Sequence, residues 1–341
     1  MWQKLKTCQT PILLYGMGDG ADKVLAQCRQ RGIPVAGVFA SDGFARHNDY
    51  QGYTVISYSE AKAQFGDMTV LVCFGTHRPE VMELIRQVCA RHQTYIPDVP
   101  VAGDTVFDWD FARAHQAELE QVYALLADEI SRRVFEDVIT YKLTGKAAYL
   151  DRCETSQAES YALLKLGSRE HFVDLGAYRG DTAADFLRLT GGSYASITAV
   201  EPEKGSFKKL CQSLEGLRDC RCVQAVMADT PGQVPFRSGR GRGSGASGSG
   251  ALMRAESLDH LLEGRPVTYL NVDVEGNEAL VLAGGRETIA AYKPKTLLAA
   301  YHRSEDLFDL PLRMLAIRPD YRVFLRHLPC YPAWDVNYIF V

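Results

Sequence analysis

One stretch constrains the fold of this chain more than any other: an apolar strand that runs into a glycine turn. The strand ends at Asp174, the turn contains Gly176, and a helix is expected to begin near Thr182. Glycine lets the backbone approach a ligand closely, and a helix N-terminus offers free N–H groups to an anion. A second apolar strand ends at Glu201-Pro202. Because a carboxylate in this position can accept both hydroxyls of a ribose, the stretch predicts a doubly wound sheet that binds a nucleoside.

Strands and helices continue to alternate through the second half of the chain, which indicates an α/β domain with a parallel sheet. Seven strands are expected, at 171–175, 197–201, 221–226, 267–272, 296–301, 322–326 and 337–341. Helices are expected between the earlier strands, at 182–189, 204–214, 257–262, 278–291 and 306–317. The last two strands have only a short connection, which favours an antiparallel hairpin at one edge of the sheet.

The first part of the chain predicts a smaller, Rossmann-like α/β domain over residues 1–107. Its first strand runs into Gly16-Met17-Gly18-Asp19-Gly20-Ala21, a turn that could hold a dinucleotide by rule. Asp19 would repel a pyrophosphate, so a nucleotide-sugar site or a structural turn is the favoured interpretation. Residues 108–165 have apolar positions at helical spacing and predict a helical connector, which leaves 166–341 as the second domain.

Composition excludes several classes of protein. The net charge of −4 provides no basic surface for nucleic acid, and no apolar run approaches the ~18 residues needed to cross a membrane. The N-terminus lacks a secretory signal, and the nine cysteines form no CxxC pair. We therefore expect a cytoplasmic protein with reduced thiols, no nucleic-acid or membrane partner and no structural zinc; a homo-oligomer is left open.

Two further groups follow strand ends that face the same crevice as Gly176 and Glu201. Asp273 and Glu275 come after the fourth strand of the second domain, and they could bind a divalent metal, orient a substrate or contact an amine. Glu275 and Glu278 could equally be helix N-terminal acids that favour the helix dipole. His302, after the fifth strand, could take a proton from a hydroxyl, or it could be a surface histidine. Asp273 and His302 are the catalytic candidates, and no metal ligand is assigned.

A stretch rich in glycine, serine and arginine interrupts the second domain at Arg237–Gly250. Such a composition cannot bury enough apolar surface to become ordered, so the prediction is a mobile loop. The alternative is a lid whose arginines, Arg237, Arg240 and Arg242, face an anionic group of the substrate.

These motifs, in this order, resemble those of the FkbM-type methyltransferases. The resemblance covers roughly residues 150–341 and rests on VDLGAYRGDT at 173–182, AVEP at 199–202, LNVDVEGNE at 270–278 and AAYHR at 299–303. ESLD at 256–259, LRH at 325–327 and NYIF at 337–340 add to it. Longer members of this family also carry a small Rossmann-like domain and a helical connector before the methyltransferase domain. The resemblance implies a class I methyltransferase sheet, S-adenosylmethionine (SAM) as the methyl donor, and often O-methylation of a small-molecule acceptor such as a sugar or secondary metabolite.

The resemblance also implies roles for individual residues around SAM. Asp174, Gly176 and Ala177 would shape the methionine pocket, Glu201-Pro202 would hold the ribose, and Ala225 and Val226 would flank the adenine. Tyr178 would cover the cofactor, and Tyr161 matches a tyrosine of the longer members. Two other functions stay open from the sequence: a nicotinamide-dependent oxidoreductase that uses the first glycine turn, and a non-catalytic module that binds a nucleotide-sugar or SAM.

Overall fold

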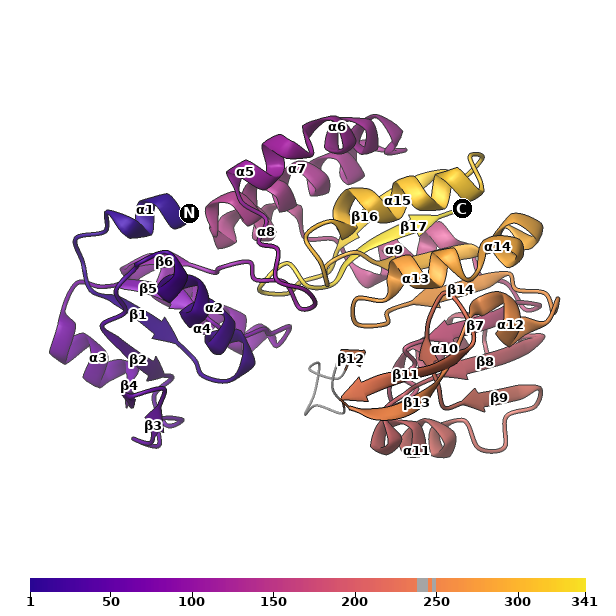
Figure 1. Cartoon of the computed structure of the whole chain (residues 1–341), viewed down its shortest axis with the longest axis horizontal. Helices are drawn as coiled ribbons and strands as arrows, with labels where there is room; N and C mark the ends of the chain where they lie inside the picture. The colour runs from indigo at the N-terminus through magenta and orange to yellow at the C-terminus, as the bar shows by residue number, and fades with distance from the viewer. Residues whose placement is uncertain (238–244, 247–249) are drawn as a thin grey trace.

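The structure, a computed structural model, describes residues 1–237, 245–246 and 250–341 and contains two large β-sheets joined by helices (Figure 1). The sheet of the N-terminal half lies at one end of the molecule and the sheet of the C-terminal half at the other, with the connecting helices along one side. No helix in the described ranges is both long and apolar enough to cross a membrane. Most of the expected loop at 237–250, with Arg240 and Arg242, lies outside the described residues, as does the side chain of Arg237.

The C-terminal sheet has seven strands in the order β16-β17-β15-β14-β7-β8-β9. Their bounds are β7 His171–Leu175, β8 Ser196–Val200, β9 Cys220–Val223, β14 Tyr269–Val272, β15 Lys295–Ala299, β16 Val323–His327 and β17 Val336–Phe340. All neighbours are parallel except β17, which runs antiparallel to β15 and β16. The predicted strands and the terminal hairpin are confirmed within a few residues. Because β7 and β14 are central and parallel, their ends form one crevice with the end of β8.

Helices cover this sheet as the hydrophobic spacing predicts, with one exception. They are α10 Asp181–Leu189, α11 Lys204–Ser213, α12 Leu258–Leu262, α13 Glu278–Ala283, α14 Arg286–Tyr292 and α15 Asp306–Ile317. The single helix expected over 278–291 is in fact two, α13 and α14, which meet at Gly284-Gly285. A Cβ on Gly284 would lie 2.7 Å from the carbonyl oxygens of Ala228 and Asp229, so the break lets this backbone pass close to its neighbour.

A second, small sheet was not predicted. It has the order β10-β13-β11-β12, with β10 Val226–Met227, β11 Gly232–Arg237, β12 Gly245–Ala246 and β13 Ala251–Glu256. Its main pair, β11 with β13, is an antiparallel hairpin that flanks the glycine-rich stretch. The alternation of apolar residues is short and weak here, which is why the sequence indicated only a loop.

The N-terminal sheet has six strands in the order β3-β4-β2-β1-β5-β6 and is parallel except for the β3–β4 pair. The strands are β1 Ile12–Tyr15, β2 Gly37–Ala40, β3 Asp49–Tyr50, β4 Tyr53–Ser57, β5 Thr69–Val72 and β6 Gln93–Tyr95. The helices are α1 Trp2–Lys6, α2 Asp19–Gln30, α3 Tyr58–Phe65 and α4 Pro79–Arg91. The cap of α3 is Ser57, in a capping box with Glu60. Ser59, in the first turn, donates its hydroxyl to Asp42, 2.7 Å away.

Five helices connect the two sheets: α5 Trp109–Ala114, α6 Gln116–Leu125, α7 Glu129–Thr144, α8 Ala147–Cys153 and α9 Gln157–Leu164. Helix α7 packs on β16, where buried Arg326 donates to Asp128 Oδ2 at 2.7 Å and to Ser131 Oγ at 2.9 Å. The N-terminal unit also contacts the C-terminal one directly, through paired backbone hydrogen bonds between Thr76 and Tyr331. Hydrogen bonds therefore join the parts of the chain in space, and the domain boundaries expected at 107 and 165 stay a prediction.

Candidate functional site

A cavity of about 510 Å³ opens at the carboxyl ends of β7, β8 and β14, within the ~300–1,000 Å³ range of small-molecule sites. Its walls come from the glycine turn after β7, the loop after β8, the segments around β10 and β11, and the strand ends at Asp273 and Tyr301. The lining residues are His77, Gly176, Tyr178, Arg179, Asp181, Thr182, Val200, Glu201, Pro202, Glu203, Ser206, Ala225, Val226, Met227, Phe236, Asp273, Val274, Glu275, Asn277 and Tyr301.

The backbone holds the carboxylate of Glu201 in this cavity. Its Oε2 accepts a hydrogen bond from Tyr178 N at 3.0 Å, and its Oε1 accepts one from Glu203 N at 2.8 Å. Each oxygen keeps a further acceptor site, because a carboxylate offers about four lone-pair positions. Burial raises the pKa of Glu201 to about 7, with neighbouring carboxylates such as Glu203 adding to the rise. Glu201 is thus a fixed acceptor whose ionisation a donor ligand would favour.

The glycine turn after β7 brings two strand ends into contact. Gly176 has φ +86°, and a Cβ at this position would overlap the carbonyl oxygen of Asp273. Beneath the turn, Asp174 is fully buried and accepts a 2.9 Å hydrogen bond from Asn271 Nδ2. Burial raises the pKa of Asp174 to about 7, with smaller contributions in the same direction from Asp181 and Asp273. The floor of the cavity therefore concentrates acidic groups.

The predicted cofactor residues fall into three groups. Gly176, Tyr178, Glu201, Pro202, Ala225 and Val226 all line the cavity. Asp174 and Ala177 are fully buried behind the lining. Tyr161 lies elsewhere: it lines a separate hollow between α9 and α10, and its hydroxyl donates to Asp185 at 3.2 Å. The placement of Tyr161 departs from the prediction because its ring packs beside α10 and not over the turn.

Asp273 and Tyr301 meet at the far side of the cavity from Glu203. The Tyr301 hydroxyl donates to both carboxylate oxygens of Asp273, at 3.3 and 3.2 Å. The ring of Tyr301 also contacts the His302 ring, with centroids 4.1 Å apart. Asp273 keeps 41% of its side chain exposed, so it can reach a molecule bound in the cavity.

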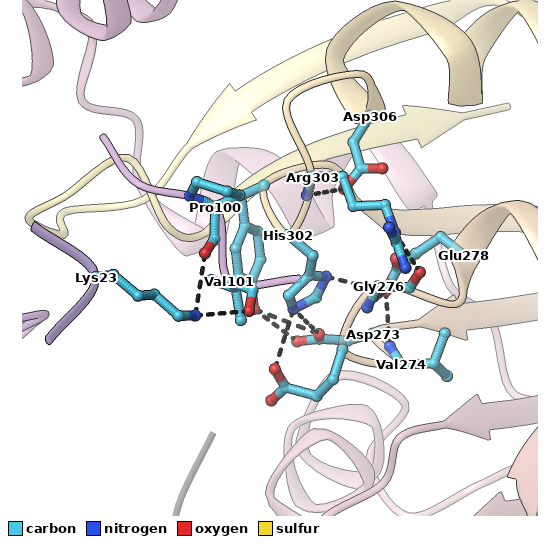
Figure 2. Close-up of polar contacts among 12 residues, drawn as sticks. Lys23, Pro100, Val101, Asp273, Val274, Gly276, Glu278, His302, Arg303 and Asp306 are labelled. Atoms are coloured by element: carbon cyan, nitrogen blue, oxygen red, sulfur yellow. Dashed lines mark hydrogen bonds and ion pairs between the residues drawn. The ribbon is translucent and has the colours of Figure 1, made fainter. Parts of the chain in front are cut away.

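His302 lies under Asp273, among three carboxylates (Figure 2). Its Nε2 is 3.3 Å from Asp273 Oδ1 and 3.5 Å from Glu275 Oε2, and its Nδ1 is 3.0 Å from Glu278 Oε1. Burial alone would lower the pKa of His302, but Glu278 and the other carboxylates outweigh it and raise the pKa to about 10. His302 is fully buried, so it is not the surface histidine that the sequence left open. The His302 ring does not line the cavity, and its expected role as the general base stays a prediction.

Glu278 is the first residue of α13, in agreement with its interpretation from sequence as a helix N-terminal acid, and its side chain is fully buried. Its Oε1 accepts hydrogen bonds from Val274 N at 2.9 Å and Gly276 N at 3.3 Å, on the side that faces His302. The sequence could not pair Glu278 with His302, because 24 residues and a β-strand separate them. A glutamate shortly after a glycine, as Glu278 is after Gly276, does not by itself indicate a histidine partner.

The N-terminal half also contributes to the site, which the sequence did not predict. His77 lines the cavity from the loop after β5. Residues Pro100–Ala102 form a linker between the two halves. Lys23 holds this linker by donating to Pro100 O at 3.1 Å and Val101 O at 2.8 Å (Figure 2). The next residue, Ala102, donates its N–H to His302 O at 2.9 Å. The linker thus supports the strand end that carries His302.

His327, the histidine of the LRH motif at 325–327, lies outside the cavity lining. It is fully buried, with Nδ1 3.8 Å from the Sγ of Cys153 on α8. Burial lowers its pKa to about 4. Its place between α8 and the sheet edge indicates a packing role.

The order and directions of the seven strands are those of a class I methyltransferase fold. Residues 174–323 match the model of the methyltransferase FkbM domain. The family resemblance found in the sequence is confirmed. A search of curated proteins finds no match.

Among solved structures, the chain is similar to methyltransferase FkbM from Methylobacillus flagellatus KT, with a TM-score of 0.76 and 23% identity. The similarity covers 97% of this chain and 90% of the other, so it includes the N-terminal unit and the connector. A fibrillarin from Aeropyrum pernix, solved with S-adenosyl-L-methionine, matches 54% of this chain and 73% of its own at 15% identity and a TM-score of 0.35. At this level the second similarity carries no further conclusion.

Proposed function

We propose that the chain transfers the methyl group of SAM to a hydroxyl of a small-molecule acceptor, such as a sugar or a secondary metabolite. The observation that carries the proposal is the carboxylate of Glu201, fixed by two backbone N–H groups beside the glycine turn. The chemistry of the cavity fits SAM, because Glu201 can accept ribose hydroxyls and the acidic groups around it complement a cationic ligand.

The residues of the cavity divide the task of binding. Gly176 and the start of α10 are placed for the methionine part, since the turn has no side chain and the helix offers N–H groups to a carboxylate. Ala225 and Val226 present small apolar surface for the adenine. When bound, SAM supplies an activated methyl group, so the protein mainly has to align that group with the acceptor.

Asp273 is the residue that we place against the acceptor. Its carboxylate lines the cavity and is oriented by the Tyr301 hydroxyl. We infer that an Asp273 oxygen receives the hydroxyl proton of the acceptor as the methyl group is transferred. His302 lies beneath the lining and keeps Asp273 in place, so it acts as a positioning residue. In this proposal Asp273, and not His302, is the general base.

Calorimetry on Glu201→Ala tests the proposal. We expect SAM affinity to fall at least about tenfold, because the ribose would lose its charged acceptor. Glu83→Ala, which removes an exposed glutamate outside the cavity, is the matched control and should bind SAM within about twofold of the wild type. Equal SAM affinity in the Glu201→Ala protein would refute the ribose assignment. Asp273→Asn should bind SAM normally but form S-adenosylhomocysteine slowly with any accepted substrate.

The first glycine turn does not favour a nicotinamide cofactor. Tyr50 donates its hydroxyl to Asp22 Oδ1 at 2.6 Å and to Gly18 O at 3.3 Å, so it lies across the start of α2. Asp19 and Asp22 place two carboxylates in the first turn of that helix, where a pyrophosphate would bind. A thermal-shift comparison of NAD(H) with SAM separates the two functions, and we expect only SAM to stabilise the protein.

A further inference from the structure

His302 has an unusual environment for a buried histidine. Its side chain is fully buried, yet its Nε2 makes no hydrogen bond to any part of the chain that the structure describes. Carboxylate oxygens of Asp273 and Glu275 nevertheless lie 3.3 and 3.5 Å from this nitrogen. Distances this short without a hydrogen bond mean that the oxygens lie off the line of an N–H at Nε2. Buried polar atoms are normally satisfied, so this arrangement calls for an explanation.

The carboxylate oxygens near Nε2 lie to the side of the N–H direction. Ligand atoms that bind one shared metal ion have the same arrangement. Two ligand atoms that bind one ion at about 2.1 Å, at right angles to each other, lie about 3 Å apart. The second atom is then displaced from the N–H direction by about 45°. The distances from Nε2 to Asp273 and Glu275, 3.3 and 3.5 Å, are close to this separation.

Glu278 completes the arrangement from behind. It faces Nδ1, the ring nitrogen that points away from Asp273, and its carboxylate is fully buried. A carboxylate behind the second nitrogen of a metal-binding histidine fixes the ring and raises its basicity. One oxygen of Glu278, Oε2, also has no hydrogen bond within the described residues. Three carboxylates around one imidazole also leave an excess of negative charge that a divalent cation would neutralise.

We propose that Nε2 of His302 and the carboxylates of Asp273 and Glu275 bind a divalent cation of the Mg²⁺ or Mn²⁺ type, with Glu278 as the orienting carboxylate. Two oxygen ligands and one nitrogen ligand suit Mn²⁺, and oxygen-rich octahedral sites suit Mg²⁺. Because octahedral coordination has six positions, three protein ligands leave about three open.

The open positions define the class of acceptor. Asp273 and Glu275 line the cavity, whereas His302 and Glu278 lie behind it, so the free side of the ion faces the cavity. An acceptor with two adjacent oxygens, one of them the hydroxyl to be methylated, would fill two positions as a chelate. Vicinal diols and α-hydroxy acids have this pattern. This part of the inference rests on the proposed function, whereas the cation site itself does not.

Electron paramagnetic resonance of Mn²⁺ added to the chelator-treated full-length protein tests the site. Mn²⁺ is chosen because it prefers oxygen and nitrogen to the cysteine thiols of the chain. We expect one bound ion, at least tenfold weaker binding in Asp273→Asn, and a ~10- to 100-fold loss in Glu278→Gln, as for other residues that support a metal ligand. Circular dichroism confirms that each variant is folded.

Glu256→Gln is the matched control, because Glu256 is also buried and pairs with a histidine, His260, at 2.6 Å. Glu256 does not line the cavity, so its variant should bind Mn²⁺ like the wild type. No Mn²⁺ binding by the wild type up to about 1 mM, or equal binding in the wild type and folded Asp273→Asn, would overturn the proposal. Water proton relaxation should rise when the ion binds, because open positions carry exchanging water; an unchanged rate would overturn the acceptor part.

A separate titration keeps this inference distinct from the proposed function. S-adenosylhomocysteine is titrated by calorimetry into the same chelator-treated protein, without metal. Its binding in the absence of Mn²⁺ binding would refute the cation site and leave the methyltransferase proposal intact. Mn²⁺ binding that Asp273→Asn weakens, without S-adenosylhomocysteine binding, would support the site and refute the proposed function.

Discussion

Replacing Asp174 by asparagine should stabilise the folded protein at pH 8 much more than at pH 5. Asp174 lies on β7 with no exposed surface, and Asn271 Nδ2 donates to its Oδ1. An asparagine at 174 can accept the same hydrogen bond through its own oxygen. The other oxygen, Oδ2, is buried without a hydrogen bond among the described residues. The main effect of the substitution is therefore to remove a buried ionisable group.

The magnitude follows from the shifted pKa of this carboxyl. Burial raises it from the ordinary 3.8 to about 7 in the folded protein. Below pH 3.8 the group is protonated in both states. Between pH 4 and 7 the unfolded chain ionises while the folded protein keeps its proton, so stability is lost as the pH rises. At about 1.4 kcal/mol per pH unit, and with the folded protein already half ionised at pH 7, the wild type loses about 2 kcal/mol relative to the variant between pH 5 and 7, and little more above pH 7.

Urea unfolding followed by circular dichroism at pH 5, 6, 7 and 8 measures this difference. Burial also raises the pKa values of Glu201 and Asp306 to about 7, but both groups are present in the two proteins, so their effects largely cancel. Glu83→Gln, at an exposed position, is the control and should give a difference that is constant with pH. If the free energy of unfolding of Asp174→Asn differs from that of the wild type by the same amount at every pH from 5 to 8, the reasoning is refuted.

Three other substitutions test different parts of the structure. Gly176→Ala should lower the free energy of unfolding by about 2–4 kcal/mol in a denaturant titration, because its Cβ would overlap Asp273 O and its φ of +86° disfavours a side chain. SAM affinity of the wild type, measured by calorimetry, should rise between pH 6 and 8 as Glu201, with its pKa of about 7, ionises; Glu201→Gln should bind weakly and without this pH dependence. Arg326→Met should lower stability by about 3 kcal/mol, seen as a reduced melting temperature, because it leaves Asp128 without its buried partner. A melting temperature equal to the wild type would show that this pair contributes little.

The sequence predicted those parts of the fold and site that depend on local patterns. The strands of the second sheet are continuous apolar runs, and Gly176, Glu201 and Asp273 each follow such a run directly, so their meeting at one sheet edge could be foreseen. The contacts that the sequence did not predict are between segments far apart in the chain. The partnership of Glu278 with His302 depends on how α13 packs against the end of β15, and the place of His77 depends on how the two halves dock. No periodicity within a segment encodes either contact.

Tyr161 shows that a local sequence match leaves the surroundings of a side chain unspecified. Its position shortly before the first strand fits the family pattern, but the helix that carries it turns its ring toward Asp185. The side-chain direction on α9 depends on packing against α10, which the sequence alone does not specify.

The linker at Pro100–Ala102 has a consequence for how such proteins can be recombined. Because Lys23 holds its carbonyl groups and His302 accepts its N–H, the linker is shared by both halves of the chain. A chimera that joins this methyltransferase domain to a relative's N-terminal unit would have to preserve that double attachment. A crossover between residues 23 and 100 should therefore be tolerated only when the donor unit offers a lysine equivalent to Lys23, because it separates that lysine from the carbonyl groups that it holds.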